Sequence, residues 1–234
     1  MTSTKPAPTS AIPTLLSLNA GYVDTIGFLA LQGLFTAHVT GNFVTLGASF
    51  VLGTSGALAK LLALPTFCVA VVLVRLFSLS LPKRNWPVLR TVLTLKVLLL
   101  IAGAVLAIRF GPFDNGDAAF AILTGLTLVA AMAIQNAAHR IHMASYPPTN
   151  LMTGTTTQIM VDIADLMHGP KAEARAALIS RLTRMSRAVA AFALGCGAAA
   201  LFYAEINVWA FALPPAIGAI VLFLNVDAFQ GEAG

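Results

Sequence analysis

Six apolar runs, separated by short polar stretches, dominate the pattern along this chain. About 20 apolar residues in a helix cross the ~30 Å hydrocarbon core of a bilayer, and the runs are close to that length. The predicted spans cover residues 12–34, 61–81, 89–108, 118–138, 188–204 and 208–226. Residues 1–11, rich in Pro, Ser and Thr, are predicted to be a disordered lead, and 227–234 a short tail. The pattern predicts an all-α polytopic membrane protein with one domain over residues 12–226.

The composition agrees with this class. Of the 234 residues, 58% are hydrophobic and 10% are charged, whereas soluble domains average about 25% charged residues. The formal charge of +5 could suggest nucleic acid as a partner. The basic residues lie in loops beside the apolar runs, however, as membrane topology requires. We therefore expect no nucleic-acid partner.

The basic loops predict the orientation in the membrane. They connect the second span to the third and the fourth to the fifth, while the remaining loops have few basic residues. The basic residues in the two loops are Lys83, Arg84, Arg90, Arg140, Lys171, Arg175, Arg181, Arg184 and Arg187. Because Lys and Arg accumulate in cytoplasmic loops, both termini are predicted to be cytoplasmic.

Two Thr-Gly steps interrupt the apolar pattern, one in each half of the chain. Thr40-Gly41-Asn42 follows the first span, and Thr153-Gly154-Thr155 follows the fourth. Three spans in each half give the two halves opposite orientations. The sequence therefore predicts two inverted three-helix repeats, about 12–110 and 117–226. Each would contain a short broken or re-entrant helix opened by its Thr-Gly motif, as in many secondary transporters.

These polar steps are candidate binding groups. Gly allows a ligand to approach the backbone, while Thr and Asn are good helix caps. Free N–H groups at a helix start favour an anion or carboxylate, and polar groups at membrane depth should line a cavity. The alternative is two capped helices without a ligand.

Asp24 is the sharpest single candidate, because a carboxylate near the centre of a span costs at least ~2.5–3.5 kcal/mol. It is either a coupling site for a proton or cation, or a structural group satisfied by a neighbouring helix. Gln135 and Asn136 hold a similar place at the end of the fourth span, where they would bind a solute or join helices. His38 could titrate near its ordinary value and act as a gate or relay.

The same motifs carry a resemblance to a known family. They are Gly21-Tyr22-Val23-Asp24, Phe35 with His38-Val39-Thr40-Gly41-Asn42, Gln135-Asn136-Ala137-Ala138 with Arg140, and Thr153-Gly154-Thr155. In order and spacing the chain resembles the YoaK-like family of predicted bacterial inner-membrane proteins, a family of unknown function. The resemblance implies a helical protein of the bacterial inner membrane and transfers no substrate.

Catalysis is not expected. Gly53-Thr54-Ser55-Gly56 matches the Gly-x-Ser-Gly pattern of rhomboid-type proteases, but that chemistry needs a later His and none follows His168. Gly and Ser are also ordinary turn residues. No phosphate-binding loop or metal-ligand spacing occurs, so we expect no cofactor and no metal.

Charged and small residues suggest further partners. Arg181, Arg184 and Arg187 recur every three residues and would contact anionic lipid headgroups. Asp162 and Asp165 share a helix face that could bind a cation, although pairing with the nearby Arg residues is favoured. Arg140 is most simply a topology anchor, but it could pair with Asp162 or with an anionic substrate.

A ridge of small residues runs along the fifth span. Ala191, Gly195 and Ala199 would pack within the bundle or against a second copy in a homodimer.

The predicted function is a small secondary transporter. It would hold a small polar or anionic solute between the two Thr-Gly helix starts, with Asp24 as the proton-coupling group. A channel, or a non-transporting scaffold or assembly protein, is the alternative.

Overall fold

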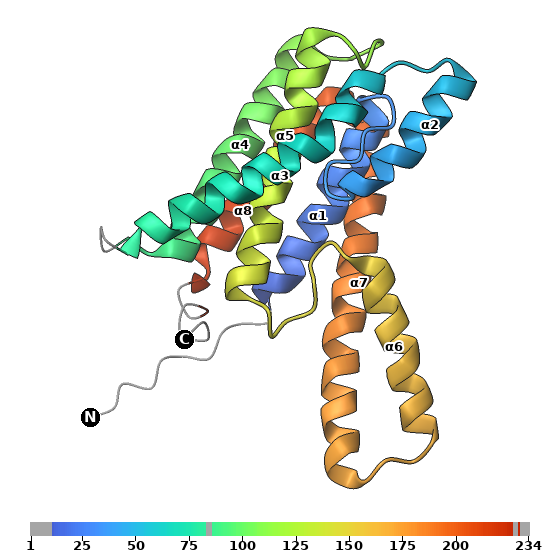
Figure 1. The fold of residues 1–234 in the computed structure, drawn as a ribbon, viewed down its shortest axis with the longest axis vertical. Helices are drawn as coiled ribbons and strands as arrows, with labels where there is room; N and C mark the ends of the chain where they lie inside the picture. The colour runs from blue at the N-terminus through green and yellow to red at the C-terminus, as the bar shows by residue number, and fades with distance from the viewer. Residues whose placement is uncertain (1–10, 83–85, 227–228, 230–234) are drawn as a thin grey trace.

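A computed structural model describes residues 11–82, 86–226 and 229, and its regular elements are helices (Figure 1). The predicted lead, apart from Ala11, and most of the predicted tail lie outside the described residues. The α-helices are α1 (Ala11–Ala30), α2 (Asn42–Leu52), α3 (Ala57–Ser80), α4 (Val88–Phe110), α5 (Ala119–His142), α6 (Met152–Met167), α7 (Ala172–Ile206) and α8 (Leu213–Phe223). Short 3-10 helices, η1 (Val39–Gly41) and η3 (Asn207–Ala212), precede α2 and α8. The all-α class is confirmed.

The helices occupy all six ranges in which spans were predicted. Four segments of the described chain are long and apolar enough to cross a membrane: Ala57–Ser80, Val88–Phe110, Ala119–His142 and Ala172–Phe223, the last of which joins α7, η3 and α8. The helix α1 is not one of these four, and it carries the polar residues Asn19 and Asp24. Asn207, in a turn conformation with positive φ, separates the fifth predicted span from the sixth.

Helix α1 packs along α7, and α5 packs against both α3 and α4. The closest approach lies where α1 crosses α7. A Cβ atom added to Gly21 would overlap the carbonyl of Phe192, and one added to Gly195 would overlap the carbonyl of Leu18. Gly195 is buried in this contact together with Ala191 and Ala199. The small-residue ridge therefore packs within the chain, against α1.

The short helices α2 and α6 lie toward opposite ends of the molecule (Figure 1). After α1 ends, residues 31–41 turn back along it, and α2 then starts and packs against α3. After α5 ends, residues 143–151 lead into α6, which packs against α7. We call residues 31–41 the outer return segment and residues 143–151 the inner return segment, after the orientation that the basic loops predict.

Helix α6 and the first part of α7 form a hairpin that projects from the bundle (Figure 1). Helix α7 has 35 residues, about 52 Å, which is longer than a membrane span needs. Within the hairpin, buried Asp162 accepts hydrogen bonds from Arg181 Nε at 2.8 Å and Nη2 at 2.5 Å. The guanidinium holds the pKa of the Asp162 carboxyl below its usual value. Asp162 thus pairs with Arg181 rather than with Arg140.

Candidate functional site

The carboxylate of Asp24 holds the outer return segment against α1. Its Oδ1 atom accepts backbone N–H hydrogen bonds from Thr36 at 2.8 Å, Ala37 at 2.7 Å and His38 at 3.3 Å. Asp24 is 5% exposed, so water contributes little to its solvation. These donors satisfy a charge that would otherwise be costly to bury, and the charge in turn satisfies N–H groups of a segment without helical partners.

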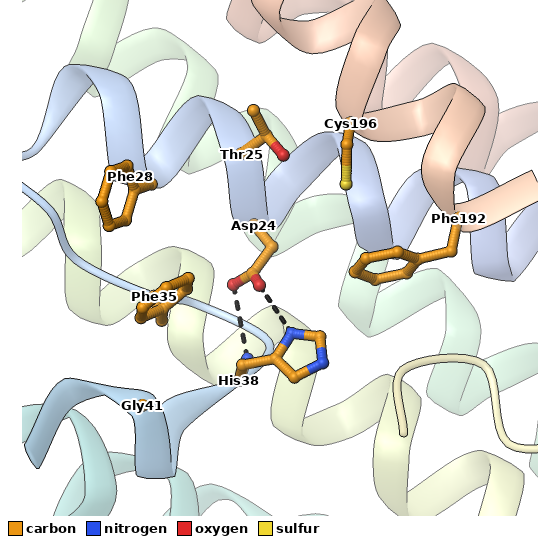
Figure 2. A pocket seen from close by; sticks show the side chains of 8 residues that line it. All are labelled: Asp24, Thr25, Phe28, Phe35, His38, Gly41, Phe192 and Cys196. Atoms are coloured by element: carbon orange, nitrogen blue, oxygen red, sulfur yellow. Dashed lines mark hydrogen bonds and ion pairs between the residues drawn. The ribbon is translucent and has the colours of Figure 1, made fainter. Parts of the chain in front are cut away.

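His38 completes the environment of the carboxylate. Its Nδ1 atom lies 2.6 Å from Asp24 Oδ2, and its side chain is 34% exposed. The ring meets Phe192 of α7 edge-on, with centroids 5.4 Å apart. Figure 2 shows the imidazole facing the carboxylate with Phe192 beside it. Asp24 and His38 therefore form an acid–imidazole pair that is buried at the carboxylate and open at the ring.

A cleft of about 490 Å³ opens at this pair, between α1, the outer return segment and α7. This volume lies within the range of small-molecule sites. Its lining residues are Asp24, Thr25, Phe28, Phe35, His38, Gly41, Phe192 and Cys196 (Figure 2). Three of them are phenylalanines, and the rings of Phe28 and Phe35 lie 5.0 Å apart. The cleft thus has apolar aromatic walls and one polar end.

The first Thr-Gly step shapes the edge of the cleft. A Cβ atom on Gly41 would lie 3.0 Å from the ring of Phe35, so the absence of a side chain lets the backbone approach that ring. Asn42 closes the segment into a loop: its Oδ1 accepts from Phe35 N–H and its Nδ2 donates to Phe35 O, both at 2.8 Å. Thr40 points to the exterior.

A second polar side chain holds the inner return segment. Gln135 of α5 is fully buried, and its Nε2 donates to Thr149 Oγ1 and to Leu16 O, both at 3.0 Å. Its Oε1 accepts from Lys96 Nζ at 2.6 Å. One turn further along α5, His139 Nε2 lies 3.0 Å from Pro147 O. Each half of the chain therefore fixes its return segment with a polar group from inside its first helix, Asp24 in one half and Gln135 in the other.

The second Thr-Gly step lies in a different setting. Helix α6 starts at Met152, so Thr153 and Gly154 stand in its first turn and are exposed. A Cβ atom on Gly154 would meet no other atom within 4 Å. Thr155 is buried, and its hydroxyl donates to Leu151 O at 2.9 Å. Nothing in this setting requires glycine for a close approach.

The predicted caps are wrong, although helices do start at both steps. The residue before α2 is Gly41 and the residue before α6 is Leu151, and neither end has a side-chain capping bond. Asn42 bonds back to Phe35 and Thr155 bonds back to Leu151, each with groups of the preceding segment. The polar side chains of these steps thus shape the loops instead of capping the helices.

Known sequences resemble this chain over most of its length. The profile of the family described as "Protein of unknown function (DUF1275)" matches residues 12–224. The chain belongs to the DUF1275 family. It is similar to the UPF0700 transmembrane protein YoaK of Bacillus subtilis (strain 168), with 32% identity over 154 residues. That match covers 64% of this chain and 65% of the length of YoaK. No solved structure matches the chain. The resemblance seen in the motifs is thereby confirmed, and with its apolar helices this DUF1275 protein is a multi-pass membrane protein.

The predicted site residues of this DUF1275 protein fall into three places. Asp24, His38 and Gly41 line the cleft, and Asn42 bonds the backbone of Phe35, another lining residue. Gln135 lies in the second polar cluster, next to half-buried Asn136. Thr40, Thr153 and Gly154 are exposed on the surface, and buried Thr155 bonds back to Leu151 of the inner return segment. The two Thr-Gly steps do not border one cavity: Thr153 lines a separate surface groove of α6.

Several residues of these clusters were not predicted. The backbone N–H of Thr36 donates to Asp24, and the hydroxyl oxygen of Thr149 accepts from Gln135, so both residues help to fix the return segments. Phe192 and Cys196 of α7 line the cleft. The largest omission is Lys96, which is buried in α4. The signal was available, because an ionisable residue within an apolar run is by default a functional candidate.

Proposed function

We propose that this protein is a small secondary transporter built from two inverted units. Its cleft at Asp24 and His38 would bind the solute, and its two return segments would serve as gates. The observation that carries the proposal is the pair of return segments. Each is fixed by a polar side chain from inside a helix, and the helices they lead into, α2 and α6, lie toward opposite ends of the molecule (Figure 1).

The packing supports two related units. Exchanging the first, second and third predicted spans with the fourth, fifth and sixth turns the α1–α7 contact into the α5–α3 contact, and both are extensive. The same exchange turns α2 on α3 into α6 on α7, and both pairs are present. Inverted repeats with discontinuous helices at a central site are the plan of many secondary transporters.

The lining of the cleft limits the chemical class of solute that could bind. One end offers the carboxylate and the partly exposed imidazole, and the walls offer three aromatic rings. A small solute with a polar or anionic group and an apolar remainder fits this lining, with the polar group at His38. The solute would thus bind between the first unit and α7 of the second unit, rather than between the two Thr-Gly steps.

Protonation of Asp24 provides the coupling. The ionised carboxylate accepts three backbone N–H bonds and faces His38, so its charge keeps the outer return segment closed. Adding a proton removes that charge and weakens all of these bonds, because hydrogen bonds to a charged group are roughly twice as strong as neutral ones. A proton arriving at Asp24 would thus open the gate as the solute enters or leaves.

Purified protein in liposomes tests this proposal. A thermal-shift screen against organic anions and small metabolites first selects a solute, and uptake of that solute is then measured with and without a pH gradient. Asp24→Asn should abolish proton-coupled uptake while the protein stays folded. Asp162→Asn, which changes the other buried aspartate of the described residues, in the α6–α7 hairpin, should leave the coupling intact. Uptake by Asp24→Asn with unchanged pH dependence would overturn the coupling role.

The orientation and lipid contacts complete the proposal. The start of α1, the end of α8 and the α6–α7 hairpin lie on one side of the molecule (Figure 1). Because the basic loops lie there, this side of the molecule would face the cytoplasm in a bacterial inner membrane.

Arg184 and Arg187 of the hairpin would contact anionic lipid headgroups. Labelling of single cysteines at Ala174 and Leu52 from each side of the membrane tests the orientation, which is wrong if Leu52→Cys reacts from the cytoplasm.

A further inference from the structure

A lysine lies buried in α4 and has no part in the cleft. Lys96 is 1% exposed, and its Nζ donates to Gln135 Oε1 at 2.6 Å. In the part of the chain that the structure describes, no carboxylate forms an ion pair with it. An ammonium group carries three donors, so this bond alone leaves a charged Lys96 incompletely satisfied. Burying such a charge without a counter-ion is very costly, and the closed structure therefore favours the neutral amine.

Unsatisfied polar atoms lie on the segments joined to this pair. Asn19 Oδ1 is buried without a partner, on α1 one turn from Leu16, whose carbonyl receives the Gln135 amide. Asn150 Nδ2 is likewise buried without a partner, directly after Thr149, which receives the same amide. Buried polar atoms without partners are rare in native structures and require an explanation, such as a functional role or a bound water. Both atoms here belong to elements that Gln135 connects to Lys96.

We propose that Lys96 is a proton-binding group of the inner gate. With the inner return segment closed, the amine is neutral and bonded to Gln135. When the segment lifts away, water reaches the amine, which takes a proton from the inner aqueous phase. The segment closes again only after that proton has left to the same phase. The inference rests on the proposed transport function and extends it to the second unit.

The charged and titratable neighbours favour this assignment to Lys96. Helix α5 contributes His139, bonded to Pro147, and Arg140 and His142 in its last turn. Helix α1 contributes Tyr22 and Asp24, both engaged elsewhere. Helix α8 and the η3 turn carry no titratable residue. The remaining groups on α4 and α3 are Arg90, Arg109, Lys60, Arg75 and Cys68. No hydrogen bond or ion pair joins any of these groups to Lys96 within the described residues.

The two gates would then respond to protons by opposite changes of charge. A proton removes the charge of Asp24, which holds the outer segment, whereas a proton creates a charge on Lys96, which the closed inner segment cannot bury. Both changes favour opening, each in response to the pH on its own side. The inner gate should therefore open more often as the inner pH falls.

A buried reporter on the inner segment tests this inference without any solute. Asn150→Cys is placed in a background with Cys68→Ala and Cys196→Ala, and inside-out vesicles are treated with a membrane-impermeant maleimide. Because thiol reactivity itself depends on pH, the rate is divided by that of an exposed reference, Ala174→Cys in the same background. With Lys96 present, the normalised labelling rate should rise roughly tenfold for each unit by which the inner pH falls, until the amine is mostly protonated.

Three variants distinguish the outcomes. Lys96→Met, which keeps the side-chain length without an amine, should label slowly at all pH values. Lys96→Arg, which keeps a permanent charge, should label fast at all pH values. Lys60→Met, which changes a buried lysine at the outer end of α3, should keep the wild-type response.

The inference is overturned if the pH response persists in Lys96→Met, if Lys60→Met removes it equally, or if Asn150→Cys never labels in protein that contains Lys96. Because no solute is used, a flat labelling response beside intact Asp24-coupled uptake refutes only this inference. A pH-dependent response without uptake refutes only the transport function.

Discussion

The outer and inner return segments solve the same structural problem with different chemistry. The outer segment is held by a carboxylate that accepts three backbone N–H groups and pairs with an imidazole. The inner segment is held by an amide that bonds one hydroxyl and one carbonyl and is itself bonded by an amine. A charged acceptor binds more strongly than an amide, so the outer segment is the more tightly held of the two. Under the proposed transport function, the two halves would respond to protons through different side chains.

Removing each holding group should give the largest contrast. Asp24→Leu leaves three backbone N–H groups without acceptors, two of them buried, at about 1–3 kcal/mol for each buried group. Gln135→Leu leaves fewer backbone groups unsatisfied. We expect Asp24→Leu to lower the free energy of unfolding by several kcal/mol more than Gln135→Leu. Denaturation in detergent, followed by the fluorescence of Trp86 and Trp209, measures both. Equal losses would mean that the two segments are held equally.

A double-mutant cycle in the inner unit should give the next largest effect. Gln135→Leu leaves Lys96 buried without its acceptor, so the single variant should be destabilised by about 2–3 kcal/mol. Lys96→Met in the same chain removes the orphaned amine, and replacing both polar partners by apolar groups is often nearly neutral. The double variant should therefore recover at least half of the loss in thermal denaturation. An additive loss would show that the amine and the amide do not act as a pair.

The two Thr-Gly steps should differ by a smaller amount. Gly41→Ala places a Cβ 3.0 Å from the Phe35 ring and should destabilise the protein by about 1 kcal/mol. Gly154→Ala meets open space in a helix and should stabilise it by about 0.5–1 kcal/mol. Paired thermal-shift measurements test the difference in sign. The same sign at both positions would restore the equivalence that the sequence suggests.

The hairpin offers the smallest effect, which is present at neutral pH and disappears in acid. Arg181 lowers the pKa of Asp162, so this pairing stabilises the folded protein above the ordinary carboxyl pKa near 4. That contribution is lost as the pH falls through the lower, folded pKa. Wild type and Asp162→Asn should therefore differ in melting temperature at neutral pH and converge in acid. A difference that stays constant to the lowest pH would exclude the ion pair as its source.

Much of the fold could be predicted from the sequence, because the apolar runs correspond to helices in every predicted range. Asp24 was identified from the cost of a carboxylate in an apolar run, and that reasoning is independent of its partners. The partners themselves could not be predicted. Asp24 reaches Thr36 and Gln135 reaches Thr149 through turns that follow no helical or strand period.

Two other features escaped for different reasons. The role of Lys96 was not predicted, because it lies within residues 92–101, which otherwise have the apolar pattern of a membrane span. A shared cavity for the Thr-Gly steps was expected because inverted repeats often meet at the midplane. Sequence similarity between two motifs carries no information about the distance between them, and in the structure they border different clefts.

The crossing of α1 and α7 at Gly21 and Gly195 limits where the molecule can deform. With no side chain between the two backbones, the pair has little freedom to slide or to tilt, since any shift would drive carbonyl groups into the facing helix. One wall of the cleft, Phe192 with Cys196, therefore belongs to the same rigid body as Asp24. Any opening of the cleft would therefore require the loop bearing Phe35 and His38 to move relative to α1 and α7.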